Sequence, residues 1–187
     1  MRQTSSIISG LSGLCEMAKL TVGKGLDEYI ATLNKLQINT RKVLGRSIYI
    51  GADIVADEIR KNIKTIPVTH KREHGTPEHP IEAITQVQYD GLLNGFGISK
   101  MKETDGVLNV KCGFSGYNKG ISVSAKNAGH TNKHQANAMI ARAVEGGTSF
   151  RKKHPFVAPA VRATKKKAES AMAEQLDKEI EKVMKGS

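Results

Sequence analysis

Histidine is the side chain in this sequence that most directly suggests metal chemistry. His70, His74 and His79 fall within one polar stretch, and His130 and His134 are four residues apart, a spacing that can hold zinc on one helix face. No cysteine lies near the first group, and no HExxH sequence includes the second pair. We therefore predict no metal site and no cofactor.

Carboxylates are the second group of candidates, because paired acidic side chains carry general acid–base catalysis. Asp27-Glu28 and Asp57-Glu58 are adjacent pairs on predicted helices, where neighbouring side chains point about 100° apart and do not converge. The predicted strand region adds few acidic residues, mostly in turns, namely Asp90, Glu103 and Asp105. No GxSxG motif for a nucleophilic serine is present. We predict that the protein is not an enzyme.

Positive charge is the strongest compositional feature. The chain has 29 Lys and Arg against 18 Asp and Glu, a formal net charge of +11. Such a balance favours a polyanion or an acidic protein surface as partner. Basic runs occur at residues 151–153 and 165–167, although lysine-rich helix faces are usually only solvated. Charge alone leaves nucleic acid and acidic protein open as partners.

The stretch over residues 137–163, NAMIARAVEGGTSFRKKHPFVAPAVRA, combines a short helix, a glycine stop and a basic loop. Its apolar spacing predicts a helix over 135–144, and Gly146 with Gly147 ends it. Prolines stiffen the following loop, and Phe156 and Val157 are expected to dock on the core. A rigid loop of this composition suits a partner or subunit contact. The predicted contact residues are Phe150, Arg151, Lys152, Lys153, His154, Pro155, Phe156 and Pro159. The alternative is a plain connection between two helices.

Helical periodicity predicts the elements that position this loop. Apolar residues recur at three- and four-residue steps over 26–36 and again over 43–63, and Pro67 ends the second run. The N-terminal helix is therefore long, and either continuous or broken near residue 39 by a cap at Asn39-Thr40. A final charged helix over 160–184 carries a thin apolar stripe and follows Pro159.

Between the helices, residues 81–124 predict an antiparallel meander of about three or four strands. At its start, Ile84, Val87 and Tyr89 suggest a strand or a short helix entering one. Asp105-Gly106 is a hairpin signal, and 118–120 predicts a turn before a strand at 121–125. We assign Gly91, Gly95 and Gly97 to turns and bulges. Residues 69–80 are polar and without period, so they predict an exposed loop. The class is α+β, with helices packed on a small sheet.

The chain predicts one domain over residues 25–187, preceded by an extension or arm over 1–24. No apolar run approaches the ~18 residues that span a bilayer, and the N-terminal apolar segment is too interrupted for a signal peptide. Cys15 and Cys112 are far apart and outside any CxxC pair, as in reduced compartments. We expect assembly in the cytoplasm and no membrane contact.

Four segments in order resemble one known family: LTVGKGLDEYIATLNKL, ADIVADEIRKNI followed by IPV, NAMIARAVEGGTS, and HPFVAPAVRA before a charged helix. They are similar to the tail-completion proteins of long-tailed bacteriophages, the minor tail-component family typed on gene product ten of a lambdoid phage. The resemblance covers roughly residues 19–184. The chain departs from it in the longer loop VTHKREHGTPEHP, where members often have an arginine-threonine-glycine turn, and in the extension before Met17.

The resemblance implies a structural virion protein of α+β fold that forms a ring, typically hexameric, where a phage tail meets the head. Its implied partners are further copies of itself and the tail tube, tail terminator or head connector, with DNA passing through the ring. The alternative from the residues alone is a free nucleic-acid-binding protein that uses the basic runs at 151–153 and 165–167, with steeply salt-dependent binding.

Overall fold

Helices and small sheets occur together along the chain, which confirms the α+β class. The computed structural model describes residues 8–9, 16–21, 31, 34, 40–70, 75–121 and 134–185. Its contacts form two units. The first takes Met1–Asp57, Ile98–Cys112 and Val161–Ser187, and the second takes Glu58–Gly97 and Gly113–Ala160. Of the expected arm over 1–24, Ile8–Ser9 and Glu16–Thr21 are described, and they form strands of the main sheet. Of the helix expected over 26–36, only residues 31 and 34 are described.

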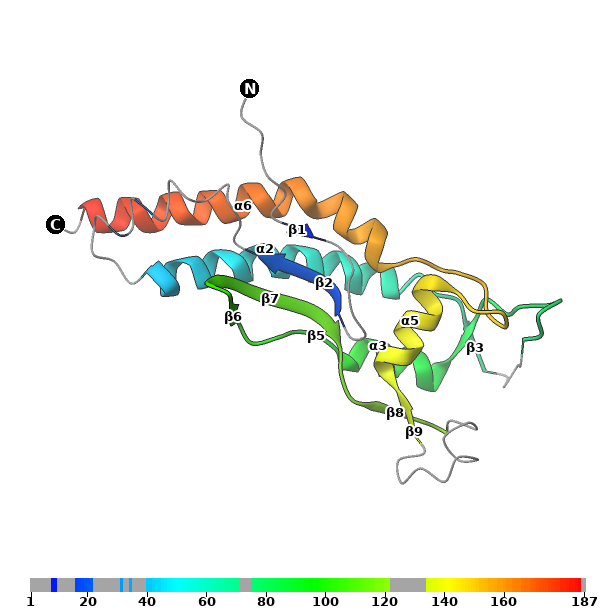
Figure 1. The fold of residues 1–187 in the computed structure, drawn as a ribbon. Helices are drawn as coiled ribbons and strands as arrows, with labels where there is room; N and C mark the ends of the chain where they lie inside the picture. The colour runs from blue at the N-terminus through cyan, green and yellow to red at the C-terminus, as the bar shows by residue number, and fades with distance from the viewer. Residues whose placement is uncertain are drawn as a thin grey trace. The chain divides into compact units, whose positions relative to one another are not determined.

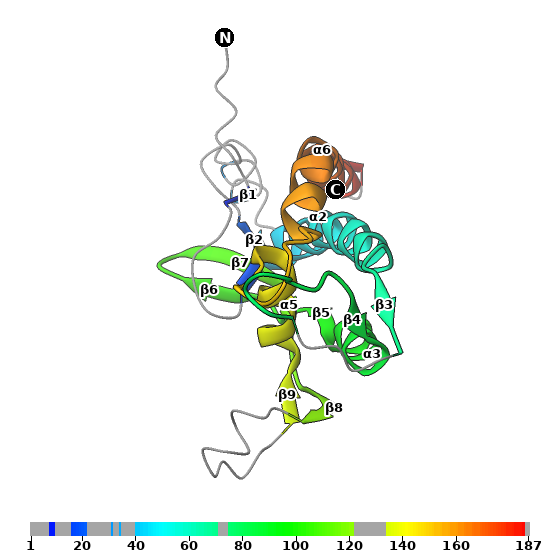
Figure 2. The same ribbon diagram turned by 90° about the vertical axis from the view of Figure 1, so that its right-hand side faces the viewer.

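Two long helices are α2 (Thr40–Ile63) and α6 (Val157–Lys185). Their parts in the first unit, residues 40–57 and 161–185, run side by side (Figure 1 and Figure 2). The apolar period predicted for α2 is confirmed, because its recurring Ile, Val and Ala side chains are buried. On α6 the narrow stripe is buried at Ala168, Met172 and Leu176. A polar contact joins the helices where Ser47 Oγ donates to the Met172 carbonyl at 2.9 Å.

A five-stranded sheet has the order β1-β2-β7-β5, with β6 also paired to β7. Its strands are β1 (Ile8–Ser9), β2 (Glu16–Thr21), β5 (Phe96–Ile98), β6 (Lys102–Thr104) and β7 (Val107–Phe114). The predicted hairpin is confirmed: β6 and β7 are antiparallel, and Asp105 (φ 53°) and Gly106 (φ 74°) form the turn. Cys112 on β7 is fully buried, with Sγ 3.9 Å from the Ala52 carbonyl of α2.

Among its described residues, the second unit contains two whole helices and two short strand pairs. Strands β3 (Val68–Thr69) and β4 (Ile84–Thr85) are parallel, and β8 (Tyr117–Ile121) and β9 (His134–Ala136) are antiparallel. Helix α3 (Gln86–Gly95) follows β4, and α5 (Asn137–Gly146) follows β9. The parallel pair departs from the expected all-antiparallel meander, since the 14 residues between Thr69 and Ile84 return the chain in the same direction.

An aromatic cluster forms the core of the second unit. The Phe96 and Phe114 ring centroids are 5.0 Å apart, and Phe114 meets Phe156 edge-on at 5.9 Å. The Arg60 guanidinium lies 5.4 Å above the Phe96 ring, a cation–π contact. Aromatic residues make up only 4% of the chain, and these three rings are concentrated in one core.

Helix α3 settles an alternative that the sequence left open, because residues 84–89 suggested either a strand or a short helix leading into one. Thr85 and Gln88 form a capping box at its start, which favours a helix despite the glycines that follow. Gly91 and Gly95 lie inside the helix, so their assignment to turns and bulges is wrong. They are needed because α3 packs closely on Asn118 and Asn137, and a Cβ at Gly91 would sit 2.6 Å from atoms of both.

Three further boundaries differ from the sequence prediction. Residues 118–120 belong to strand β8 rather than to a turn, and of the strand predicted at 121–125 only Ile121 lies within the described residues. Helix α5 spans Asn137–Gly146 instead of 135–144. Helix α6 begins at Val157, so Pro159 lies within its first turn. Within the described residues, no helix has the length and apolarity needed to cross a bilayer.

Candidate functional site

The candidate site is the loop over residues 147–155 that joins α5 to α6 within the second unit. Gly147 caps α5 with φ 75° and ψ 172°, a conformation that only glycine adopts without strain. A Cβ there would also approach the Lys153 nitrogen at 3.1 Å. The predicted glycine stop is confirmed at Gly147, whereas Gly146 has open space around it.

A tight turn forms the tip of this loop. Thr148 and Arg151 exchange backbone hydrogen bonds, with N–H···O distances of 2.9 and 3.2 Å. The Phe150 amide also donates to Thr148 Oγ1 at 3.3 Å. Ser149 and Phe150 are therefore held at the tip, where the Phe150 side chain is 56% exposed. An exposed phenylalanine on a hydrogen-bonded turn is presented outward at little cost in conformational freedom.

A second loop, residues 75–83, supports the first. The Ile81 amide donates to the Phe150 carbonyl at 3.2 Å, and the Lys152 amide donates to the Ile81 carbonyl at 2.8 Å. Gly75 allows the closest approach, since a Cβ there would lie 1.9 Å from the Phe150 carbonyl oxygen. Thr76 and His79 form a turn of their own by exchanging backbone hydrogen bonds of 3.1 Å. We call residues 75–83 and 147–155 together the paired loops.

Arg151 holds the paired loops together instead of facing outward. Its Nη1 donates to the Ala83 carbonyl at 2.7 Å and lies 3.5 Å from the Glu82 carbonyl. Desolvation by burial lowers the pKa of Arg151 from its usual value, and the group remains charged at neutral pH. This arginine was predicted as a contact residue, and the structure gives its guanidinium a bracing position.

Glu145 at the end of α5 caps the start of α6. Its carboxylate accepts the backbone amides of Phe156 at 2.7 Å, Val157 at 2.9 Å and Ala158 at 3.0 Å. The next residue, Pro159, has no amide hydrogen, so the donors normally left unsatisfied at a helix start are all accounted for. A negative charge at this end also complements the helix dipole. The two helices are thus tied directly across the loop.

The remaining predicted residues divide between anchors and exposed positions. Phe156 is fully buried and Val157 is 2% exposed, so the predicted docking of both on the core is confirmed. The buried ring of Phe156 removes it from the surface that can touch a partner. His154 is half-buried, with its amide donating to the Val144 carbonyl at 2.8 Å. The exposed members of the predicted set are Phe150, Lys152, Lys153 and Pro155, with Pro159 half-buried.

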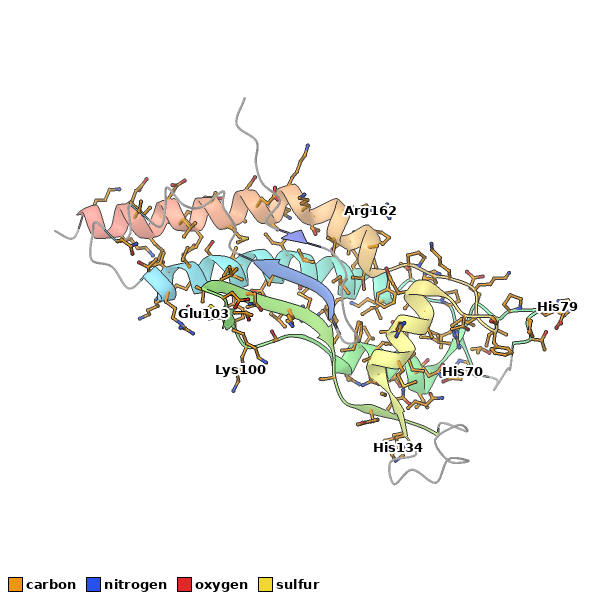
Figure 3. The ribbon with its side chains drawn as sticks, viewed as in Figure 1. His70, His79, Lys100, Glu103, His134 and Arg162 are labelled. Atoms are coloured by element: carbon orange, nitrogen blue, oxygen red, sulfur yellow. The ribbon has the colours of Figure 1, made fainter. Side chains whose placement is uncertain are left out.

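Histidines, cysteines and carboxylates do not gather into a metal centre in the described part of the chain. No three His, Cys, Asp or Glu side chains there lie close enough to hold a metal ion. His70, His79 and His134 occupy separate places in Figure 3, and His74 and His130 lie outside the described residues. Glu103 instead pairs with Arg41 at 2.6 Å, in the first unit.

The basic run on α6 is partly a solvated helix face. Lys166 and Lys167 are exposed, and Lys165 is half-buried. Further along, lysines and glutamates pair along the helix, as in Lys178–Glu174 at 2.7 Å and Lys185–Glu181 at 3.3 Å. The pKa of Glu174 is lowered by its hydrogen bond and charge interaction with Lys178. Such exposed pairs add little stability but keep the outer face of the helix polar.

Sequence reasoning missed Glu145 and the loop 75–83 as parts of the site. Glu145 lies eleven residues before Phe156, beyond the three-residue reach of a capping box, so no local pattern reveals its role. For the second loop, the sequence offers one indication, which is Gly75. A glycine often marks a position where another backbone segment approaches closely. The chain matches no family model, no curated protein and no solved structure.

Proposed function

We propose that the protein is a structural virion component that assembles as a ring at the neck, or top of the tail, of a phage or phage-tail-like particle. It completes the tail and joins it to the tail tube, tail terminator or head connector. It carries no catalytic role. It is assembled in the host cytoplasm and ends in the virion.

The observation that carries this proposal is the rigid presentation of Phe150, Lys152 and Lys153. Glu145 fixes the start of α6, and the loop 75–83 fixes the turn at Phe150. The exposed side chains therefore project from a backbone that hydrogen bonds hold in place. Contact surfaces of assembled proteins are enriched in aromatic side chains, and rigidity lowers the entropy lost on binding. This arrangement supports a protein-contact role for the loop.

The segments that resemble tail-completion proteins supply the bracing residues. In NAMIARAVEGGTS, Asn137 Nδ2 donates to the Ser115 carbonyl at 2.8 Å, and Glu145 and Gly147 set the loop. In HPFVAPAVRA, Phe156 is the buried anchor. The segments that resemble the family therefore contain the residues that fix this loop. This supports the proposal that the loop has the same role in assembly as in the tail-completion proteins.

A second candidate is direct nucleic-acid binding, favoured by the exposed Lys166 and Lys167 of α6 and the exposed Lys152 and Lys153. A protein that neutralises phosphates binds with steep salt dependence, because counterions are released. Weak DNA binding that does not change with salt would remove this candidate.

The test is the assembly state of the purified full chain, alone and mixed with tail tubes, by mass measurement and electron microscopy. We expect rings, either free in solution or seated on the end of a tube. Because some ring proteins assemble only on a partner, the mixture is the deciding sample. A strict monomer that joins neither tubes nor connectors would overturn the proposal.

A further inference from the structure

A short segment of the first unit crosses from β5 to β6 and is held against α2. It follows Ile98, the last residue of β5, and leads into β6, which begins at Lys102. We call residues 99–103 the strap. Lys100 and Glu103, which belong to it, are labelled in Figure 3.

Polar contacts hold both ends of the strap on α2. The Tyr49 hydroxyl accepts the Met101 amide at 2.8 Å and donates to the Ser99 carbonyl at 3.4 Å. Two residues further along the strap, Glu103 pairs with Arg41 at 2.6 Å. Tyr49 and Arg41 are eight residues apart, which places them on one side of the helix.

The thioether of Met101 covers the helix between these two contacts. A Cβ added at Gly45 would lie 3.1 Å from Met101 Sδ and 3.2 Å from Met101 Cε. Gly45 is buried and Met101 is half-buried. Four helical residues rise about 6 Å and two strand residues about 6.6 Å, so the contacts of the two elements stay in step. Met101 is therefore the central contact of the strap.

Methionine sulfur is open to oxidation, which turns an apolar thioether into a polar sulfoxide. Three methionine side chains are described: Met139 is 71% exposed, Met172 is fully buried, and Met101 lies between them. Oxidation of the exposed Met139 would disturb little packing, and the burial of Met172 protects it. Met101 is the one of the three that is both reached by a small oxidant and packed against another element.

We propose that Met101 is a site of oxidation by peroxides and that its sulfoxide releases the strap from α2. The sulfur attacks one peroxide oxygen, the S–O bond forms, the O–O bond breaks, and water or an alcohol leaves. The sulfur is oxidised and the peroxide is reduced. Because methionine sulfoxide is reduced again by methionine sulfoxide reductases, the change is reversible.

The release follows from what the sulfoxide oxygen would meet. Gly45 has no side chain, and it lies beyond the first turn of α2, so its amide already donates within the helix. An oxygen pressed against this surface would have no donor there, and a buried acceptor without a donor is unfavourable. The sulfoxide therefore turns to water and draws Met101 away from the helix. The site lies outside the paired loops and does not depend on the proposed neck role.

Amide hydrogen exchange of the full chain, measured by NMR before and after hydrogen peroxide treatment, tests the release. The Met101 amide donates to Tyr49, whereas the Ser99 amide donates to the Lys111 carbonyl of β7 at 2.8 Å. We expect exchange at Met101 to become about tenfold faster, while exchange at Ser99 stays unchanged. Mass spectrometry of the peptide that contains Met101 measures the oxidised fraction. A methionine sulfoxide reductase should then restore slow exchange.

Two variants control for the other methionines and the cysteines. Met101→Leu keeps an apolar side chain of similar volume that peroxide does not oxidise, and it should exchange slowly before and after treatment. Met101→Gln puts a polar group against Gly45 and should speed exchange at position 101 without any peroxide. The Ser99 amide shows in both variants whether the sheet around the strap is intact.

Several results would overturn the proposal. Met101 could stay unoxidised while Met139 is converted, or it could be oxidised with no change in exchange. Equal acceleration at Ser99 and Met101 would mean general unfolding instead of release of the strap. A response of Met101→Leu equal to that of the unmodified chain would place the effect at another residue.

Discussion

A single carboxylate, that of Glu145, sets the geometry between α5 and α6. It accepts three backbone amides and replaces the side-chain cap that the local sequence does not provide. A charged acceptor bonded to backbone donors forms stronger hydrogen bonds than a neutral one. The orientation of the candidate contact loop therefore depends on one residue at its base more than on the residues it exposes.

We predict that Glu145→Ala lowers the free energy of unfolding by about 1–2 kcal/mol, because three amides at the start of α6 lose their acceptor. Glu145→Gln should retain part of the stability through its amide oxygen. Urea denaturation measures both. The matched control is Glu174→Ala on the exposed face of α6, which should change little. Equal effects at the two glutamates would contradict the capping role.

Phe156→Ala should lower the free energy of unfolding by ~3 kcal/mol or more, since its ring is fully buried against Phe114. Phe150→Ala removes an exposed ring and should leave the unfolding midpoint within experimental error. Thermal and urea denaturation of both variants check the contrast. A soluble, fully stable Phe156→Ala protein would show that the ring does not anchor the loop.

At the scale of elements, glycine decides how closely α3 packs. Alanine in a helix is normally favoured over glycine by up to about 1 kcal/mol. At Gly91 the opposite sign is expected, because an added Cβ would meet Asn118 and Asn137 at 2.6 Å. Replacing Gly91 would stabilise the helix by reducing the flexibility of the unfolded chain. The steric clash in the folded state destabilises the protein by more than this.

Gly91→Ala should therefore destabilise the protein by about 1–3 kcal/mol, the usual range for overpacking. Gly146→Ala, at the last position of α5 with open space around it, should be neutral or slightly stabilising. Thermal unfolding midpoints of the two variants give the comparison. The packing argument fails if Gly91→Ala is the more stable of the two.

Elements with local signals could be read from the sequence. The apolar period of α2 and the Asp105-Gly106 turn each depend on neighbouring residues, and both were predicted correctly. The extent of helix α3 through Gly91 and Gly95 could not be predicted, because these glycines serve a tertiary contact that no local pattern shows. The strand at 118–120 was missed because Asn-Lys-Gly is typical of a turn, while its pairing partner in β9 is distant in sequence.

The same distinction applies to the candidate site. The glycine stop and the buried anchor at Phe156 follow from composition and spacing, and both could be predicted. The inward orientation of the Arg151 side chain could not be predicted, because its acceptor, the Ala83 carbonyl, is 68 residues away in the sequence. Nonlocal hydrogen bonds decide which basic residues of the loop remain free, and only the structure gives them.

At the scale of the whole molecule, a net charge of +11 does not by itself identify a partner. On the paired loops, Glu78 and Glu82 stand beside Lys152 and Lys153, whereas Lys166 and Lys167 lie together on exposed α6. Two lysine pairs with different surroundings allow the roles of charge in assembly and in nucleic-acid binding to be separated.

Lys152→Glu with Lys153→Glu should leave the protein folded and impair its assembly, measured as the fraction of rings by electron microscopy. Lys166→Glu with Lys167→Glu makes the same change in charge on α6 and should assemble normally. Circular dichroism establishes folding of both. If the two double variants assemble equally poorly, overall charge matters and the loop has no special role.

The hairpin turn at Asp105-Gly106 offers a way to count subunits. It is exposed, lies between two antiparallel strands and takes no part in the paired loops. Loop tips of this kind tolerate inserted peptide. An epitope tag placed there would give each copy one visible antibody mark, and the number of marks around a particle would report the stoichiometry without a reconstruction.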